Sequence, residues 1–125
     1  MDAAWLLQAP YYIHSPDLGS LFVHAGMLSQ VELSRQNLWV MMNVRSATDD
    51  GKVSPRCLHN FPWAKHWRGP LTLYFGHDAA RGLQQFPHAI GLDTGCVYGE
   101  RLTAVLLPEK DIVSVPARKV YIDSK

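Results

Sequence analysis

Two short apolar segments, each followed by a histidine beside a glycine, constrain this chain more than any other feature. They are Leu21-Phe-Val-His-Ala-Gly26 and Leu71-Thr-Leu-Tyr-Phe-Gly-His-Asp78. Runs of four or five residues rich in Val, Phe, Tyr and Leu are typical of buried strands. A histidine at the end of such a strand leaves the core where the backbone turns. The adjacent glycine permits an unusual backbone conformation or a close approach by another group.

His24 and His77 are therefore candidate metal ligands, since neutral imidazole binds Mn, Fe and Zn in company with carboxylates. The alternative interpretation is that each histidine is a hydrogen-bonded turn residue. A catalytic metal takes at least three protein ligands, so carboxylates are needed as well. The candidates are Asp17, Asp78 and Asp93. Each of them also fits a turn or a helix cap, which leaves the chain short of acidic ligands.

Size and charge favour one globular domain. The chain has 125 residues and a net charge of +1, so no global field attracts it to nucleic acid or to a membrane. Its apolar runs are too short for a membrane span or a secretory signal. Its two cysteines, Cys57 and Cys96, have no CxxC spacing. These features predict a cytoplasmic protein.

The order of patterns predicts a mixed α/β fold in which strands dominate the second half. A helix over 5–8 is expected to stop before Pro10, and a second helix is expected in the later part of 28–45. Asp78 is expected to cap a third helix, which runs to Gln85. Residues 52–69 are expected to form an ordered loop, and 49–51 a turn. Strands are predicted over 11–13, 20–23, 71–75, 88–92, 102–107 and 112–115, the first two forming a hairpin.

Arg45 follows an apolar helical stretch and could aim its guanidinium at a phosphate or a carboxylate. It could equally be a solvated arginine favoured by the helix dipole. His59, His66, Trp63 and Trp67 could form a recognition wall, or they could fill the space beneath a long loop. No Ser-His-Asp triad, phosphate-binding GxxxxGK loop or HExxH motif supplies another chemistry.

Several segments in a fixed order carry a family resemblance. They are Leu21-Phe-Val-His-Ala-Gly26, Asn37-Leu-Trp-Val-Met-Met-Asn-Val-Arg45, Gly69-Pro-Leu-Thr-Leu-Tyr-Phe-Gly-His-Asp78, Gly91-Leu-Asp-Thr-Gly-Cys-Val-Tyr-Gly99 and Leu102-Thr-Ala-Val-Leu. Over residues 5–116 the chain resembles the C-terminal half of calcineurin-like metallophosphoesterases. It is most similar to the ApaH-like, diadenosine tetraphosphatase-like phosphatases of the phosphoprotein phosphatase superfamily.

The resemblance implies half of a two-layer β-sandwich flanked by helices, with residues 1–125 forming a partial metallophosphoesterase domain. It implies two divalent ions (Mn, Fe, Zn or Mg) at the strand ends, with His24 a ligand of one and His77 a ligand of the other. Arg45 matches the arginine that grips phosphoryl oxygens, and Tyr98 matches a residue at the active-site mouth. The implied reaction is in-line attack on phosphorus by a metal-activated hydroxide.

The chain departs from the family pattern because GDxHG, GDxxDRG and GNH, which supply the acidic ligands and the general acid, do not occur in it. We therefore expect a fragment of a phosphoesterase that is inactive alone, with no catalytic residue of its own. The alternative is a non-catalytic, degenerate half-domain that acts through a partner chain. Implied partners are the N-terminal half and a phosphorylated substrate: dinucleoside polyphosphate, polyphosphate, capped RNA or phosphoprotein. Uncovered strands predict association or aggregation.

Overall fold

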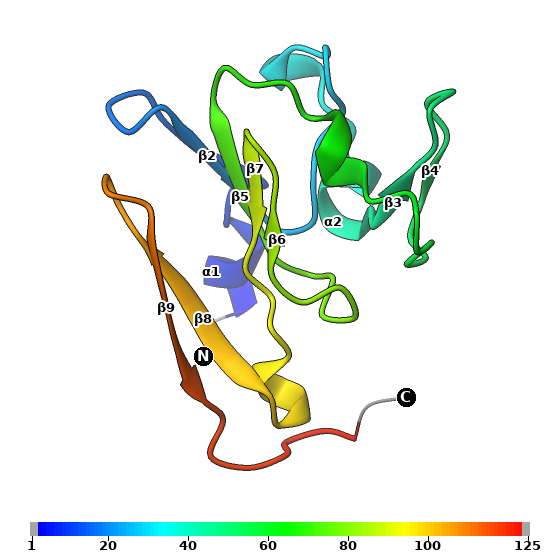
Figure 1. Ribbon diagram of the computed structural model, residues 1–125. Helices are drawn as coiled ribbons and strands as arrows, with labels where there is room; N and C mark the ends of the chain where they lie inside the picture. The colour runs from blue at the N-terminus through cyan, green and yellow to red at the C-terminus, as the bar shows by residue number, and fades with distance from the viewer. Residues whose placement is uncertain (1–2, 124–125) are drawn as a thin grey trace.

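A five-stranded mixed sheet forms the centre of the computed structural model, which describes residues 3–123 (Figure 1). The strand order is β1-β2-β5-β7-β6. The strands are β1 (Tyr12–Ser15), β2 (Ser20–Val23), β5 (Thr72–Phe75), β7 (Ala89–Gly91) and β6 (Gln84–Gln85). The three inner strands β2, β5 and β7 run parallel, and the outer two pair antiparallel. The predicted mixed α/β class and the β1–β2 hairpin are confirmed.

One face of this sheet carries the hydrophobic core. Leu21, Leu73 and Phe75 point to it, the last two because side chains two residues apart on a strand share a face. Leu21 and Leu73 are fully buried, and each contributes about 1.5–3 kcal/mol by leaving water. The helix α2 (Leu38–Asn43) and the short 3-10 helix η2 (Trp63–His66) cover this face (Figure 1).

The sequence sets both ends of α2. Asn37 caps it, because the side-chain oxygen of Asn37 accepts a hydrogen bond from the backbone N–H of Val40 at 3.0 Å. Val40 and Met41 turn inward and are buried, whereas Leu38 and Trp39 on the outer side remain about half exposed. The helix ends when Val44 adopts extended backbone. The helix predicted in the later part of 28–45 is therefore present but short, and the 3-10 helix η1 (Leu33–Arg35) precedes it.

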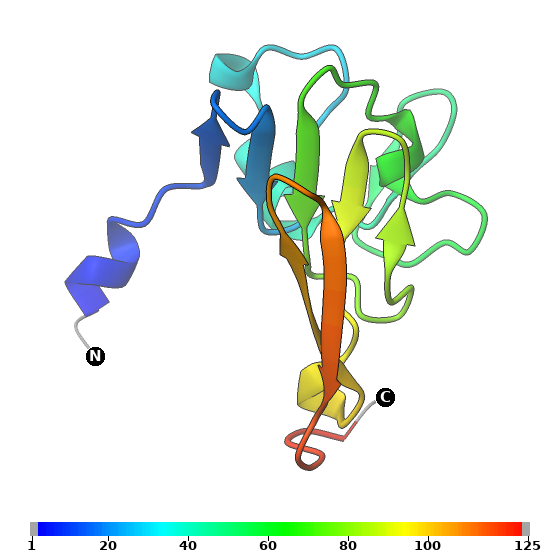
Figure 2. The same cartoon turned by 60° about the vertical axis from the view of Figure 1, so that its left-hand side comes forward.

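Two small antiparallel sheets complete the fold. One pairs β3 (Ser46–Ala47) with β4 (Val53–Ser54) across the predicted turn at 49–51. The other pairs β8 (Arg101–Leu106) with β9 (Asp111–Pro116) and lies on the opposite side of the central sheet from α2 (Figures 1 and 2). The 3-10 helix η3 (Cys96–Tyr98) leads into β8. Helix α1 (Ala3–Leu7) buries no residue and stands away from the sheet (Figure 2).

The β8–β9 hairpin has one packed face and one bare face. Thr103 faces inward, where its hydroxyl contacts that of Thr94 at 2.5 Å. The register places Leu102 opposite Val115 on the other face, with Val113 and Leu106 further along. These four side chains are 46–59% exposed. The bare face is a contiguous apolar strip, of a kind that water-exposed strands rarely present.

Two predicted elements differ from the structure. Residues 52–69 are not one loop but contain β4 and η2. Trp63 of η2 is buried in the core and packs edge-on against Phe75, with the two ring centroids 4.9 Å apart. The helix predicted from Asp78 to Gln85 is wrong. Gly82 adopts φ +67°, which ends the turn, and Gln84–Gln85 pairs with β7 as a strand.

The two tryptophans and His66 fill space, as the second of the two interpretations held, whereas His59 is exposed. Trp63 is 3% exposed, and the indole N–H of Trp67 donates to the carbonyl of Leu71 at 2.9 Å. His66 contacts the carbonyl of Ala47 at 3.1 Å. Within the described range 3–123, no helix has the length and apolar character needed to cross a membrane.

Candidate metal and phosphate site

The parallel strands bring His24 and His77 to one edge of the sheet. The carboxyl ends of parallel strands meet at the same edge. His24 follows the last residue of β2 directly, and His77 lies two residues beyond the end of β5. The backbone N–H of Gly76 donates to the carbonyl of His24 at 2.9 Å. The His24 Nε2 and His77 Nδ1 atoms are 3.2 Å apart, with ring centroids at 4.9 Å.

The two neighbouring glycines differ in what they contribute. A Cβ on Gly26 would lie 2.5 Å from the Trp63 ring and 2.7 Å from Val44, so Gly26 permits the predicted close approach. A Cβ on Gly76 would meet nothing closer than 3.8 Å. The unusual backbone predicted for this neighbourhood belongs to His77 itself, whose φ is +75°. That conformation is disfavoured for a residue with a side chain, and the His77 ring lies against that of His24.

The hydrogen bonds of His77 fix its tautomer. Its Nε2 atom lies 3.2 Å from the carbonyl oxygen of Asn43. A carbonyl only accepts, so Nε2 carries the proton and Nδ1 keeps its lone pair toward His24. Burial lowers the pKa of His77, and the positive charges of Arg45 and His24 lower it further. The ring is thus held in the neutral form that binds a cation.

The separation of the two ring nitrogens suits a single cation. Imidazole nitrogens lie about 2.0–2.1 Å from a zinc-like ion. Two such ligands with a 3.2 Å separation subtend an angle of about 103° at the metal, between the octahedral and tetrahedral values. Within residues 3–123, no group of three or more His, Cys, Asp or Glu side chains gathers to hold a metal. The histidines therefore fit as two ligands of a larger set.

The three candidate carboxylates do not complete that set. Asp93 lines a shallow cleft with both histidines, but its Oδ1 accepts from the N–H of Gly95 at 3.2 Å, as predicted for a turn aspartate. Asp17 lies in the β1–β2 turn, at the other end of β2 from His24. Asp78 does not cap a helix: it is buried and pairs with Arg81 at 2.6 Å.

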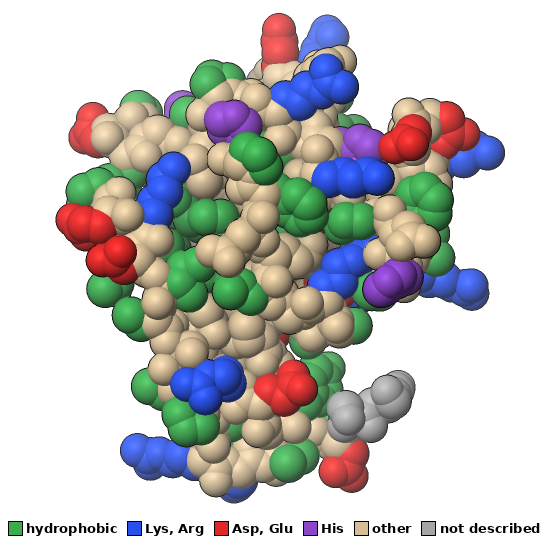
Figure 3. Space-filling model, viewed as in Figure 1, with side chains coloured by type: hydrophobic (Ala, Val, Ile, Leu, Met, Phe, Trp, Pro, Cys, Tyr) green, Lys and Arg blue, Asp and Glu red, His purple; other side chains and the backbone are tan. Residues whose placement is uncertain are grey.

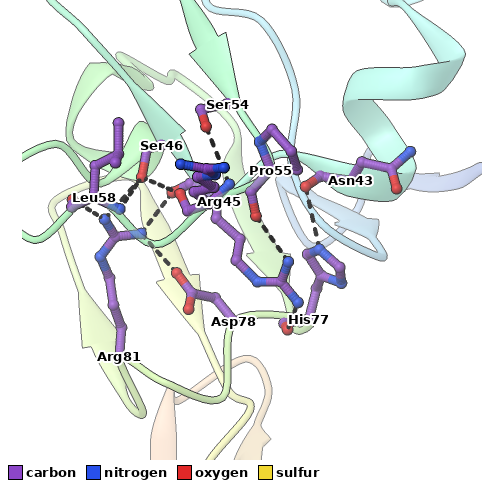
Figure 4. A network of polar contacts seen from close by, with 10 residues as sticks. Asn43, Arg45, Ser46, Ser54, Pro55, Leu58, His77, Asp78 and Arg81 are labelled. Carbon is purple, nitrogen blue, oxygen red and sulfur yellow. Dashed lines mark hydrogen bonds and ion pairs between the residues drawn. The ribbon is translucent and has the colours of Figure 1, made fainter. Parts of the chain in front are cut away.

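Arg45 lies beside His77 and is held in place by backbone carbonyls (Figure 4). It follows α2 and leads into β3, and its side chain is half-buried. One terminal nitrogen donates to the carbonyl of Pro55 at 2.8 Å, and the other donates to the carbonyl of His77 at 3.2 Å. A guanidinium has five N–H donors, so further donors can address an oxyanion. The interpretation of Arg45 as a solvated helix-end arginine does not describe this geometry.

Arg81 is a second arginine at the site that sequence reasoning missed. Its guanidinium donates to the carbonyl of Arg45 at 2.6 Å, the hydroxyl of Ser46 at 3.0 Å and the carbonyl of Leu58 (Figure 4). Together with the Asp78 pair, these bonds join the turn after β5 to the β3 strand. The available signal was the spacing of Asp78 and Arg81, opposite charges three residues apart.

A cleft of about 620 Å³ opens beside these groups. Arg45, His77 and Tyr98 of η3 are among the residues that line it. In Figure 3 an indentation lies on the right of the molecule, with Lys, Arg and His side chains above it and Asp and Glu side chains below it. Sequence reasoning did not single out the other charged residues of the cleft: Arg56, Glu100 and Asp123.

Comparison with known proteins points to one group. No family model matches the chain. The chain is 32% identical over 123 residues to a protein of Oceanobacillus iheyensis named bis(5'-nucleosyl)-tetraphosphatase PrpE [asymmetrical], covering 94% of this chain and 47% of the relative. A protein of the same name from Bacillus thuringiensis is 31% identical over 119 residues, covering 94% of this chain and 48% of that protein.

A crystal structure described as that of a candidate diadenosine tetraphosphatase superposes with a TM-score of 0.83. It is 39% identical and matches 91% of this chain and 54% of its own. The chain thus spans about half the length of the relatives it matches, consistent with their C-terminal half. Along almost its whole length, the chain is similar to the ApaH-like, diadenosine tetraphosphatase-like phosphatases, as its motifs indicated.

Proposed function

We propose that this chain is the cation- and phosphate-binding half of a metal-dependent phosphohydrolase that cleaves phosphoanhydride bonds. The carrying observation is the 3.2 Å approach of His24 Nε2 and His77 Nδ1 beside the guanidinium of Arg45. Phosphoryl transfer needs a bound cation and a group that holds the phosphoryl oxygens. The two histidines and Arg45 could supply both at one edge of the central sheet. Residues 1–125 would form a partial metallophosphoesterase domain.

We propose one shared ion for the two histidines, in place of the separate ions that the resemblance implies. A separation of 3.2 Å lets both nitrogens reach one ion at about 2.0–2.1 Å, and it is also compatible with two ions about 3.5–4 Å apart. The Asn43 carbonyl restrains the His77 ring from turning. A second divalent ion (Mn, Fe, Zn or Mg) would then depend on ligands from the other half.

Each residue has a distinct part in the proposal. A divalent ion held by His24 and His77 would polarise a phosphoryl oxygen and lower the pKa of a bound water. Arg45 would hold a second oxygen of the same phosphoryl group through donors not used by Pro55 and His77. The general acid is proposed to come from the other half, so no residue of this chain is proposed to transfer a proton.

The substrate class follows from the relatives. Their names specify bis(5'-nucleosyl) tetraphosphates, and we propose a dinucleoside polyphosphate for this chain as well. Polyphosphate, capped RNA and phosphoprotein share the phosphoryl group that Arg45 would hold, and they are the alternative substrates to compare with diadenosine tetraphosphate once hydrolysis is restored. A cytoplasmic location stays a prediction.

We propose that the purified chain alone hydrolyses little or no diadenosine tetraphosphate. A catalytic ion takes at least three protein ligands, and within 3–123 the histidines supply two. A polypeptide carrying GDxHG, GDxxDRG and GNH should restore hydrolysis when added. Turnover by the chain alone that disappears with EDTA and with His24→Ala would contradict the proposed inactivity.

Cation binding tests the proposal directly. Titration of the chain with Co²⁺, followed by its visible absorption, should give one ion per chain, and His24→Ala or His77→Ala should each weaken binding by at least tenfold, since a two-residue site loses half its ligands. His14→Ala, an exposed histidine on β1, is the matched control. Binding that is insensitive to both site variants would refute the cation site.

The alternative function, a non-catalytic half-domain that acts through a partner chain, is favoured by the bare face of β8–β9. Leu102 and Val115 lie opposite one another there and are 59% and 57% exposed. A partner could cover them whether or not a metal is bound. Continued inactivity after addition of the missing motifs, with a stable complex formed, would support this alternative.

A further inference from the structure

Two chemically different groups of residues line the cleft beside Arg45, and we call the parts that they form its two ends. Arg45, His77 and Arg56 form the first end, since Arg45 donates to the carbonyls of His77 and of Pro55, the neighbour of Arg56. The second end is formed by residues in and just after η3 and in the C-terminal segment bonded to them: Tyr98, Glu100, Ile122 and Asp123. An anionic phosphate chain is attracted to the first end and repelled by the carboxylates of the second.

The second end is built by the C-terminal segment 117–123 folding back on η3. The backbone N–H groups of Tyr121 and Ile122 both donate to the carbonyl of Val97, at 2.9 and 3.0 Å. The N–H of Ala117 donates to the carbonyl of Glu100 at 2.7 Å. Gly99 permits the contact, since a Cβ there would lie 2.6 Å from Val120. These contacts hold the segment beside Tyr98.

We propose that the wall formed by Tyr98, Glu100, Ile122 and Asp123 binds the nucleoside of the substrate. This inference rests on the proposed function and adds the location of the subsite. Tyr98 is 38% exposed, and a base could stack on its phenol ring. The side chain of Ile122 offers an apolar surface beside it. The carboxylates of Glu100 and Asp123 can accept hydrogen bonds from ribose hydroxyls or base amino groups.

The size of the cleft agrees with this assignment. A volume of about 620 Å³ lies within the range of roughly 300–1,000 Å³ that holds drug-sized organic ligands. A single phosphoryl group would fill only the cationic end. The cleft is therefore oriented, with the phosphates near His77 and the uncharged nucleoside near the C-terminal segment.

Comparison of inorganic pyrophosphate with ADP isolates the nucleoside contribution. Calorimetric titration of the full chain should show ADP binding about tenfold more tightly than pyrophosphate, as one stacked base contributes. Tyr98→Ala should remove most of this difference and leave pyrophosphate affinity within about twofold. Tyr11→Ala is the matched control, because this tyrosine precedes β1, is 51% exposed and does not line the cleft. Arg45→Ala should weaken the binding of both ADP and pyrophosphate.

The outcomes separate the two proposals. Equal affinities for ADP and pyrophosphate, with both sensitive to Arg45→Ala, would overturn the nucleoside wall and leave the proposed function standing. An equal loss of both ligands in Tyr98→Ala would also overturn it, because Tyr98 would then belong to the phosphate end. If neither ligand binds in an Arg45-dependent manner, the phosphate site and the nucleoside wall are both refuted.

Discussion

The guanidinium of Arg45 donates to the carbonyl oxygen of His77 at 3.2 Å, so the proposed oxyanion-binding residue and a proposed cation ligand share one hydrogen bond. His77, whose φ is +75°, accepts this hydrogen bond through its carbonyl, while its ring contacts that of His24. Displacement of either residue should therefore shift the other.

Loss of the buried Asp78–Arg81 ion pair should destabilise the chain strongly. The two side chains are 3% and 11% exposed. Arg81→Ala leaves the carboxylate of Asp78 buried without its partner, which costs about 3–5 kcal/mol in comparable pairs. Urea unfolding should show this loss, whereas Arg35→Ala, an exposed arginine in η1, should change stability by less than about 0.5 kcal/mol. Equal effects of the two substitutions would show that the pair contributes little.

Stability should depend on pH through His77. Its pKa in the folded chain lies below the ordinary value of 6.5, so the unfolded chain binds the proton more tightly. The free energy of unfolding should be unaffected by this group above pH 6.5, and it should decrease as the pH falls from 6.5 to the lowered pKa. The difference between wild type and His77→Gln in metal-free buffer isolates this contribution. A difference that does not vary with pH would mean that the pKa is not shifted.

The two glycines at the strand ends should respond differently to alanine. In Gly26→Ala the new methyl group would lie 2.5 Å from the Trp63 ring, and such overpacking costs about 1–3 kcal/mol. It should also move the turn that carries His24 and weaken Co²⁺ binding. Gly76→Ala is the control, because its Cβ would make only ordinary contacts. Comparable thermal unfolding of both variants would count against the close approach at Gly26.

The bare face of β8–β9 should drive self-association of the isolated chain. Val115 is 57% exposed opposite Leu102, and Val115→Lys places a charge on this strip. Sizing with light scattering should show a lower mean mass than for wild type. Ser34→Lys adds the same charge at an exposed position in η1 and should leave the mass unchanged. A monomeric wild-type chain would show that the face does not associate.

The two strand ends could be predicted from sequence because their information is local. An apolar run followed by His and Gly specifies a buried strand and its exit from the core, and β2 and β5 were found within a residue of their predicted bounds. That β2 and β5 lie next to each other could not be predicted from either segment alone. It depends on the parallel pairing of Leu21 with Leu73, residues separated by 52 positions.

The helix predicted after Asp78 failed because tertiary contacts outweigh local propensity. Asp78 is a good cap residue, but its carboxylate is taken by Arg81. Gln84 then pairs with Gly91 of β7, an interaction that the pattern of 78–85 does not reveal. The role of Arg81 was missed for the same reason, since its acceptors Arg45, Ser46 and Leu58 are distant in sequence.

The far end of the cleft was also beyond sequence reasoning. Residues 117–123 have no strand or helix pattern, and they reach Tyr98 only because two backbone amides meet the Val97 carbonyl. Tyr98 itself was identified through the resemblance. Its neighbours Ile122 and Asp123 had no signal that separated them from an ordinary chain end.

The anchoring of Tyr121 and Ile122 to Val97 also determines how the protein should be handled. A purification tag or fusion partner joined at the carboxyl end would pull on the segment 117–123, which helps to line the proposed nucleoside site. Helix α1 at the opposite end buries no side chain, so an affinity handle attached there should leave ligand measurements undisturbed.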